Sequence, residues 1–372
     1  MKTLRFLKKL IFIFLGVVLL NGCKGKLKVG ILMPKSQQYK GFVQEFKNGW
    51  DLKSSFIQDY NKKVEVIWEN YEESPAGVQK SFENLLKKKV KFIIGPLTSQ
   101  HAAYVVYSAE NNEIPILLPA VTSVYVVRNK RYIWRFCTNN KAFARAFRWL
   151  LAKRLKLSNI IVYYQIGDKY CEELSDFINK YLKESNVNIM EIRPIFEDIS
   201  TEEEIQTIKK NKPDGIVIIG FPSACKEFVK ELRKNGYAGP IFGGDSWDDP
   251  SFIEFLKKNG GTYYIITHFS PLTKERNIRN FVEKYFRKYN STPTFMAVIG
   301  YDMAGYVYKI AEEAPSYSKK AVIGAMRKVV YNGLLGQVNF GTGNESGTKR
   351  VAVLKIEKGE MKFVASIPVS PY

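Results

Sequence analysis

Short apolar segments alternate with amphipathic segments from Leu27 onward, and this alternation constrains the fold more than any other feature. The segments Lys91–Ile94 and Ile216–Ile219 are almost continuously apolar, which is typical of strands buried on both faces of a sheet. Strands separated by helices predict parallel sheets with right-handed crossovers. We therefore expect an α/β fold.

The strand-and-helix cycle occurs twice along the chain, so the sequence predicts two doubly wound lobes built on parallel sheets. The expected strands are Leu27–Met33, Val64–Trp68, Val90–Ile94, Ile114–Leu118, Tyr132–Phe136, Ile160–Tyr164, Ile189–Phe196, Gly215–Ile219, Ile241–Phe242 and Tyr263–Thr267, followed by a hairpin of Val351–Ile356 and Met361–Ile367. The expected helices are Lys40–Tyr60, Pro75–Lys89, Gln100–Asn112, Lys169–Glu184, Glu202–Lys210, Ser223–Asn235, Lys274–Tyr289, Phe295–Glu313 and Lys319–Val330.

Loops that carry hydroxyl groups follow two neighbouring strands of the first predicted lobe. In the loop Gly95–Ser99, Ser99 is expected to be the N-cap of the next helix. The loop Pro119–Ser123 contains Thr122 and should reach the same sheet edge. Hydroxyls and free amides that meet at this edge would suit a ligand carboxylate. Ser99 taken alone is explained better as a simple helix cap.

Asp245 lies in a glycine-flanked loop, Gly243–Trp247, directly after the strand Ile241–Phe242. A carboxylate at the carboxyl end of a strand can face a cleft between lobes and pair with an ammonium group. The alternative for this residue is a structural role in a turn or a helix cap.

The N-terminus has the pattern of a secretory signal peptide. Four cations precede the apolar run Leu10–Leu20, which is too short to span a bilayer as a mature helix. The run ends at Leu20–Cys23 (LNGC), which resembles a bacterial lipobox. Residues 1–22 are therefore expected to be removed and Cys23 to carry a lipid anchor. The alternative is an ordinary signal peptide with an incidental cysteine.

The chain is strongly basic, with a formal charge of +21 that falls to +17 once the four cations of the leader are removed. This charge could serve nucleic acid, an anionic membrane surface or a solvated, lysine-rich exterior. The lysines are scattered at helix ends and beside strands. Because the chain also carries an export signal, we expect a solvated exterior and no nucleic-acid partner.

Sequence motifs for metal binding, cofactors and catalysis are absent. Cys137, Cys171 and Cys225 are widely spaced without a CxxC pair, so no metal site is expected; they could form one disulfide or remain buried thiols. The histidines are His101, expected to be solvent-facing or packed, and His268. The chain has no Gly-x-Ser-x-Gly, P-loop or His-Glu-x-x-His motif, so we expect neither enzyme activity nor a cofactor.

Short segments in a fixed order give the chain a resemblance to a known family. They are Val29–Leu32 (VGIL), Ser74–Pro75 with its helix, Ile93–Ser99 (IIGPLTS), Ile114–Thr122 (IPILLPAVT), Trp134–Arg135 and Gly220–Phe221. In this order they resemble solute-binding proteins of the leucine/isoleucine/valine type, which have the type I periplasmic-binding fold. The resemblance extends from about Leu27 to about Val364.

The resemblance implies that a ligand's two charged ends are held by different lobes. Ser99, Ala120 and Thr122 would hold an α-carboxylate, and Asp245 would receive an α-ammonium group. The family often has glutamate at the position of Asp245, so the side chain here is shorter by one methylene.

Three aromatic residues would complete this site by the same resemblance. Tyr39 would stack on the ligand from the first lobe, and Tyr170 and Phe221 would contact it from the second. Many members have glycine where Cys171 follows the first-helix tyrosine, and tyrosine is common at the position of Phe221. The implied site therefore has partners for both ends of an amino-acid backbone and fewer polar contacts for its side chain.

The family fold also passes between the lobes three times, with the crossovers expected near Asn139, His268 and Phe340. The implied first lobe is 27–138 plus 268–338, and the implied second lobe is 139–267 plus 339–372. The lobes would close like a hinge and bury the ligand, where a lower dielectric strengthens polar contacts.

We therefore expect a monomeric, lipid-anchored protein of the cell envelope, outside the cytoplasm. It would bind a small solute, most suitably an amino acid, and deliver it to an ABC permease in the membrane. The alternative is an envelope lipoprotein of the same fold that senses a ligand or regulates a membrane or cell-wall enzyme.

Overall fold

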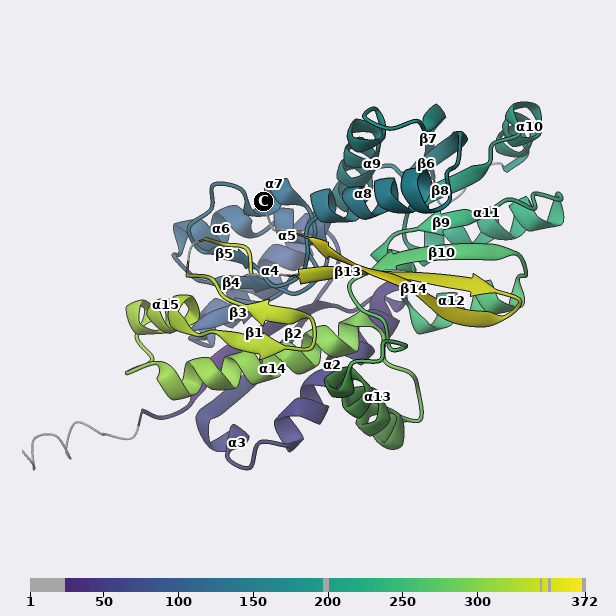
Figure 1. Cartoon of the computed structure of the whole chain (residues 1–372). Helices are drawn as coiled ribbons and strands as arrows, with labels where there is room; N and C mark the ends of the chain where they lie inside the picture. Colours follow the sequence, from purple (N-terminus) through teal and green to yellow (C-terminus); the bar gives the residue numbers. More distant parts are fainter. Residues whose placement is uncertain (1–23, 197–200, 342, 347–348, 370–372) are drawn as a thin grey trace, which may run out of the picture.

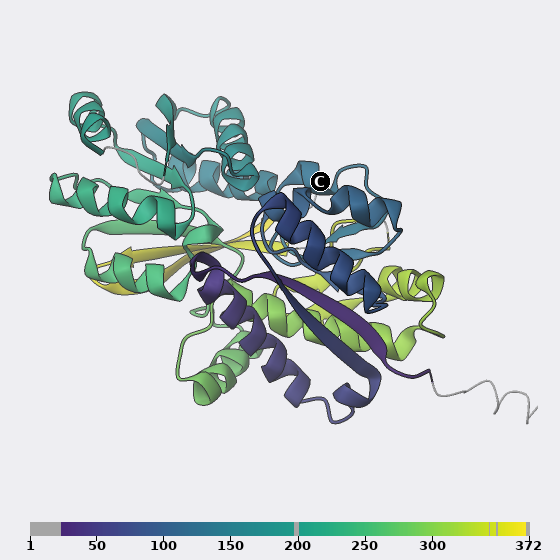
Figure 2. The same ribbon diagram turned by 180° about the vertical axis from the view of Figure 1, so that it is seen from behind.

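The computed structural model describes residues 24–196, 201–341, 343–346 and 349–369. These residues form two lobes, each with a central sheet covered by helices on both faces (Figure 1), and Figure 2 shows the same two lobes from behind. The prediction of two doubly wound α/β lobes is confirmed. The signal peptide 1–22 and the lipidation site Cys23 lie outside the described residues and stay predictions.

The first lobe is built on five parallel strands in the order β2-β1-β3-β4-β5. The strands are β1 (Leu27–Pro34), β2 (Val64–Tyr71), β3 (Phe92–Ile94), β4 (Ile116–Leu118) and β5 (Ile133–Arg135). Along β1, Val29 and Ile31 face one hydrophobic layer and Leu32 faces the other. This two-residue period explains why apolar runs without alternation form these strands: both faces are covered.

The helices of the first lobe are η1 (Gln37–Tyr39), α2 (Lys40–Ser55), α3 (Tyr60–Lys63), α4 (Pro75–Lys87), α5 (Ser99–Ala103), α6 (Val106–Asn111), α7 (Val124–Val127), α13 (Arg276–Tyr289), α14 (Phe295–Glu313) and α15 (Lys319–Lys328). Helices α2 and α14 pack closely at Gly49 and Gly300. A Cβ at either position would collide with the backbone of the other helix, so glycine permits this approach. The single helices expected over Lys40–Tyr60 and Gln100–Asn112 are each divided into two, which corrects those predictions.

The second sheet repeats the same order in its parallel part, β7-β6-β8-β9-β10. Its strands are β6 (Asn159–Gln165), β7 (Asn188–Ile195), β8 (Gly215–Ile219), β9 (Ile241–Gly243) and β10 (Thr262–Thr267). The predicted C-terminal hairpin is β13 (Lys349–Glu357) with β14 (Glu360–Val369), and β13 is antiparallel to β10. A short hairpin of β11 (Tyr331–Gly333) and β12 (Gly336–Val338) joins β13 through the pair Gly336–Lys349.

Two layers of helices cover the second sheet. Helices α8 (Asn140–Arg148) and α9 (Lys169–Leu182) contribute to the hydrophobic cluster that continues into the first lobe, and a π-helical turn, η2 (Trp149–Arg154), extends α8. Helices α10 (Thr201–Asn211), α11 (Pro222–Lys234) and α12 (Pro250–Lys258) pack on the opposite face, and the turn η3 (Asp245–Trp247) follows β9. No helix was expected between Phe136 and Ile160, so α8 is an element that the sequence reading missed.

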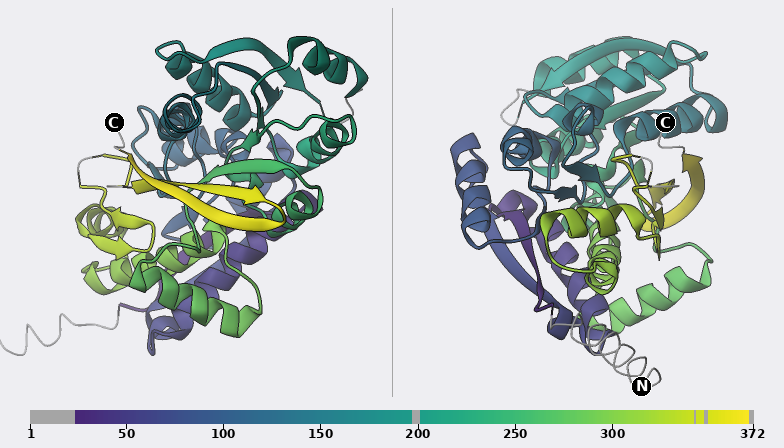
Figure 3. Two further views of the ribbon diagram at one scale, coloured as in Figure 1. Left: turned by 45° about the vertical axis from the view of Figure 1, so that its right-hand side comes forward. Right: turned by 90° about the vertical axis from the view of Figure 1, so that its left-hand side faces the viewer.

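The chain passes between the lobes after β5, after β10 and before β13. Figure 3 shows the β13–β14 hairpin, in yellow, extending from the junction between the lobes. The end of β5 is hydrogen-bonded to the segment that follows β12. Arg135 N donates to Asn344 O at 2.8 Å, and Ser346 N donates to Arg135 O at 3.2 Å. Residues 344–346 therefore still lie beside β5 of the first lobe.

The structure shows that residues up to Ser346 still contact the first lobe, and the position of the third crossover, expected near Phe340, stays a prediction. The Phe340 ring is buried and packs 5.9 Å from the ring of Tyr306 on α14, within the first lobe. The lobe ranges expected from the sequence also stay predictions.

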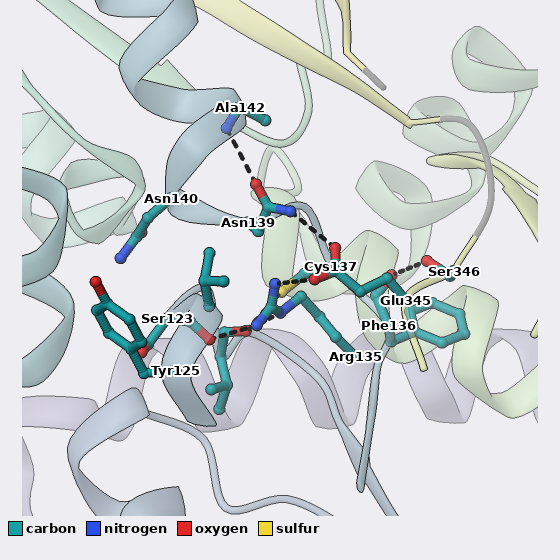
Figure 4. A network of polar contacts seen from close by, with 12 residues as sticks. Ser123, Tyr125, Arg135, Phe136, Cys137, Asn139, Asn140, Ala142, Glu345 and Ser346 are labelled. Carbon is teal, nitrogen blue, oxygen red and sulfur yellow. Dashed lines mark hydrogen bonds and ion pairs between the residues drawn. The ribbon is translucent and has the colours of Figure 1, made fainter. Parts of the chain in front are cut away.

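The side chain of Arg135 holds this junction together (Figure 4). It is fully buried, and its guanidinium donates to Val121 O at 2.9 Å and to Ser123 O. It also pairs with Glu345 at 3.0 Å, and Asn139 Nδ2 donates to the second oxygen of that carboxylate at 2.8 Å. A planar group with several fixed donors suits such a junction better than a flexible ammonium would.

We expect Arg135→Met to lower the free energy of unfolding by about 3 kcal/mol, because it removes the guanidinium donors from two buried carbonyls and breaks the pair with the Glu345 carboxylate. The lower end of the range for a broken buried pair applies, since a quarter of the Glu345 side chain remains exposed. Urea unfolding followed by circular dichroism measures the change.

The control is Arg287→Met, which removes an exposed Arg–Glu pair on α13. It should leave stability nearly unchanged, because pairs in water contribute little. Equal effects of the two substitutions would contradict the role assigned to Arg135.

Candidate ligand-binding site

A small pocket lies between the lobes, where the carboxyl ends of strands from both sheets meet. Its lining contains six of the seven predicted site residues, namely Tyr39, Ser99, Ala120, Tyr170, Phe221 and Asp245. The remaining lining residues, which the sequence reading did not assign to the site, are Phe42, Leu97, Thr98, Ser246, Phe295 and Met296. Phe295 and Met296 begin α14, far along the chain from the other first-lobe residues, and no local sequence signal placed them here.

Aromatic rings from both lobes meet in this pocket. The Tyr39 ring of the first lobe lies 5.5 Å from the Phe221 ring of the second lobe, edge to face at 87°. The Tyr170 ring lies 5.9 Å from Phe221 on the other side. The contact between Tyr39 and Phe221 spans the gap, so the lobes are closed on each other.

On the first lobe, the helix cap is Thr98 and not Ser99, which corrects the prediction. Thr98 has extended backbone angles, and its Oγ1 accepts a hydrogen bond from His101 N at 3.2 Å. Ser99 is the first helical residue, and its Oγ accepts from Ser123 N at 3.2 Å. The structure thus joins the two hydroxyl-bearing loops directly, as their adjacent strands led us to expect.

Thr122 belongs to the second of these loops but is not among the residues that line the pocket. It is buried, and its Oγ1 has no hydrogen-bond partner within the described part of the chain. Its carbonyl accepts from Asn140 N at 2.9 Å, which ties this loop to the start of α8. The ligand contact implied for Thr122 stays a prediction.

Asp245 reaches the pocket from η3 of the second lobe and is only 5% exposed. Its Oδ2 accepts a hydrogen bond from His268 Nε2 at 3.1 Å. Its Oδ1 is buried and has no partner among the residues that the structure describes. The adjacent Ser246 Oγ donates to Gly220 O at 2.8 Å and lies 3.5 Å from the Tyr170 hydroxyl. A residue that lines the pocket therefore has a buried carboxylate oxygen without a hydrogen-bond donor, which is unfavourable unless a donor arrives.

The other histidine, His101, is packed behind Tyr39. Its Nδ1 lies 3.1 Å from the Tyr71 hydroxyl, and its ring contacts the Tyr39 ring edge-on at 5.5 Å. Burial lowers the pKa of His101 to about 4, so the ring is neutral at neutral pH. Of the two alternatives expected for this residue, the structure supports the packed one.

A second interlobe contact lies beside the pocket, at Glu173 of α9. Its carboxylate accepts from the amides of Val124 at 2.9 Å and Tyr125 at 3.2 Å, which begin α7 of the first lobe. It also accepts from Ser123 Oγ at 3.2 Å and from Asn140 Nδ2 at 2.6 Å. A carboxylate of one lobe thus satisfies free amides of the other.

The cysteines do not belong to this site. Cys137, Cys171 and Cys225 are buried free thiols, and burial raises the pKa of Cys137 and of Cys225 to about 12. Within the described ranges, no group of three or more His, Cys, Asp or Glu residues is arranged to hold a metal ion. None of the helices in the described part of the chain has both the length and the apolar character needed to cross a membrane.

Two lobes that enclose a small polar-and-aromatic pocket at opposed strand ends define a solute-binding protein of the type I periplasmic-binding fold. A family model described as "Periplasmic binding protein" matches residues 26–360. The chain belongs to this family. A comparison with curated protein sequences finds no significant match.

Solved structures with the same fold include binding proteins with different ligands. A leucine-binding protein of Thermotoga maritima is 23% identical, with a TM-score of 0.83 over 92% of this chain and 98% of that one. A branched-chain amino acid transporter substrate-binding protein of Streptococcus pneumoniae, in complex with isoleucine, is 19% identical, with a TM-score of 0.81 over 93% and 100%. A solute-binding protein of an ABC transporter from Rhodopseudomonas palustris, in complex with benzoate, is 17% identical, with a TM-score of 0.83 over 93% and 98%.

Beside the pocket, Asp248 links η3 to the start of α14. Its Oδ2 accepts from Thr267 Oγ1 at 2.7 Å and from Phe295 N at 3.3 Å. Burial raises the pKa of Asp248 to about 7, and the charges of Glu45 and Asp245 act in the same direction, while the two hydrogen bonds oppose the rise. The Asp248 carboxyl group therefore titrates near neutral pH.

We expect Asp248→Asn to gain stability relative to the wild type as the pH rises from about 4 to about 7. In this pH range the Asp248 side chain keeps its proton in the folded wild type but has lost it in the unfolded chain, so rising pH favours unfolding. Asparagine does not titrate, so the variant lacks this pH-dependent loss of stability. Urea unfolding of both proteins at pH 5 and pH 8 measures the difference. Asp176→Asn, at an exposed position on α9, controls for the lost charge. If the free energy of unfolding of the variant minus that of the wild type stays constant or falls from pH 5 to pH 8, the raised pKa of Asp248 is contradicted.

Proposed function

We propose that this protein is an extracytoplasmic lipoprotein that binds an amino acid between its lobes and delivers it to an ABC importer. Membership of the periplasmic binding protein family supports the binding role. The basic and apolar leader supports export, and Cys23 at its end supports a lipid anchor. A leucine-binding protein and a branched-chain amino acid binding protein in complex with isoleucine are similar in fold over nearly the whole chain.

The observation that carries the amino-acid proposal is the unsatisfied Oδ1 of Asp245, buried in the pocket wall. A ligand ammonium would donate to this oxygen and neutralise the buried charge, which is a strong interaction at low dielectric. The ligand of the benzoate-bound relative has a carboxylate and no ammonium group. An anion of that kind would be repelled by Asp245, so a zwitterion fits this pocket better.

The opposite end of the ligand would lie on the first lobe. Ser99 Oγ, the backbone at Ala120 and the first amides of α5 lie on one side of the pocket, and Asp245 lies on the other. A carboxylate there would accept hydrogen bonds from hydroxyl and amide donors. We propose that Thr122, whose hydroxyl is free of hydrogen bonds to described residues, joins this group when the ligand is bound.

The pocket wall between these two ends is apolar. Phe42, Leu97, Phe221, Phe295 and Met296 contribute to it, together with the ring of Tyr39. A polar ligand side chain would lose hydrogen bonds to water against this wall without regaining them. We therefore propose an amino acid with an apolar side chain as the ligand class.

The mechanism follows from which lobe holds each group. The first lobe would capture the amino acid with Ser99 and its neighbours. Hinge closure would then bring Tyr170, Phe221 and Asp245 onto the ligand and exclude water. The closed form would dock on the permease, and the lipid at Cys23 would keep the protein near the membrane.

We expect an apolar amino acid such as L-leucine to stabilise the wild-type protein against heat. A ligand that binds only the folded state at a hundred times its Kd adds about 2.7 kcal/mol. A melting-temperature screen with all common amino acids and with benzoate identifies the ligand class. Stabilisation by benzoate alone would contradict the proposal, and stabilisation by no small solute would favour an envelope regulator of the same fold.

We expect Asp245→Asn to weaken binding of that amino acid at least about a hundredfold, because the isosteric amide removes the charge that pairs with the ammonium. Isothermal titration calorimetry gives the affinity, and the melting curve without ligand shows that the variant folds. Asp176→Asn is the matched control on the second lobe and should bind like the wild type. Unchanged affinity of Asp245→Asn would remove Asp245 from the site.

A further inference from the structure

His268 lies at the second crossover, directly after β10, and is 5% exposed. Its Nε2 is 3.1 Å from Asp245 Oδ2. A carboxylate can only accept hydrogen bonds, so Nε2 carries the proton and donates it to Oδ2. This leaves Oδ1 as the oxygen that is free to accept from the pocket.

The imidazole ring is held in place by aromatic contacts from both lobes. The Phe143 ring of α8 contacts it edge-on at 4.8 Å, and the Phe295 ring at the start of α14 lies 5.0 Å away at 37°. Phe143 belongs to the second lobe and Phe295 to the first. The position of the Nε2 donor is therefore determined by packing at the hinge, in the closed arrangement of the lobes.

Among the residues that the structure describes, the carboxylate of Asp245 forms no ion pair with a lysine or arginine, and its basic partner is His268. The imidazole Nε2 engages one oxygen, Oδ2, through a single hydrogen bond, whereas an arginine at this place would be able to engage both oxygens at once. Oδ1 therefore remains available to the ligand.

We propose that His268 is a positioning residue for ligand recognition. By holding Oδ2 of Asp245, it presents Oδ1 to the ammonium group of an amino acid. This inference rests on the proposed function, because it assigns His268 to the ammonium end of that same site. A short aspartate side chain needs such a partner, since one rotation about its Cα–Cβ bond would turn Oδ1 out of the pocket.

The test compares L-leucine with 4-methylpentanoate, which has the same side chain and carboxylate but no amine. A second pair is L-phenylalanine and 3-phenylpropanoate. His268→Phe keeps a ring between Phe143 and Phe295 but has no donor, and it should weaken amino-acid binding by about tenfold or more. Binding of the acid without the amine should change little. A purely structural role would lower both affinities by the same factor.

His268→Gln should restore most of the preference for the amino acid over the matching acid without an amine, because its amide nitrogen can take the place of Nε2. If His268→Phe does not fold, His268→Asn replaces it, since its amide is too short to reach Oδ2. His101→Phe is the matched control: it replaces the other buried, ring-packed histidine, and it should leave the ratio of the two affinities unchanged.

The outcomes separate this inference from the proposed function. A wild type that binds the amino acids, together with a His268→Phe variant that keeps the wild-type affinity ratio, overturns the role of His268 alone. A wild type that binds neither amino acid overturns both. The inference is supported if the affinity for the amino acid relative to the matching acid without an amine falls in His268→Phe and recovers in His268→Gln.

Discussion

Both sheets direct the carboxyl ends of their strands at one gap, and every polar group of the site depends on this arrangement. The three crossovers impose it, because they fix the orientation of one sheet against the other. Arg135 is central to the junction: from the end of β5 it bonds two carbonyls of the loop before α7 and pairs with Glu345 of the segment after β12. Loops that carry Ser99 and Asp245 meet across the gap only because this junction places them there.

Much of the architecture was predictable from periodicity. Strands such as Ile216–Ile219 are apolar on both faces because helices cover both, and the structure places them as expected. Helix α8 was missed between two expected strands. Phe340, near which a crossover was expected, has its ring buried against Tyr306 of the first lobe. Tertiary packing, which a local pattern does not contain, decided these points.

The site was predictable to a different degree. Loop position and family resemblance led to six residues that line one pocket, yet they assigned the helix cap to Ser99 when the hydroxyl of Thr98 makes that bond. Serine is preferred over threonine at helix N-caps, so the sequence favoured Ser99, and only the backbone path shows that the helix begins one residue earlier. Phe295, Met296 and His268 come from segments that only the crossovers bring to the gap. The proposed recognition of an ammonium group therefore depends on residues whose proximity is a property of the whole fold.

The contact at Glu173 has a consequence for the unliganded protein. Its hydrogen bonds to the amides of Val124 and Tyr125 join the lobes without involving any group that a solute would touch. They stabilise the closed form whether or not the pocket is filled. Each 1.4 kcal/mol of this stabilisation changes the ratio of closed to open molecules tenfold. The resting balance between the two forms, and with it how often an empty carrier occupies its membrane partner, is therefore adjustable through one carboxylate outside the pocket.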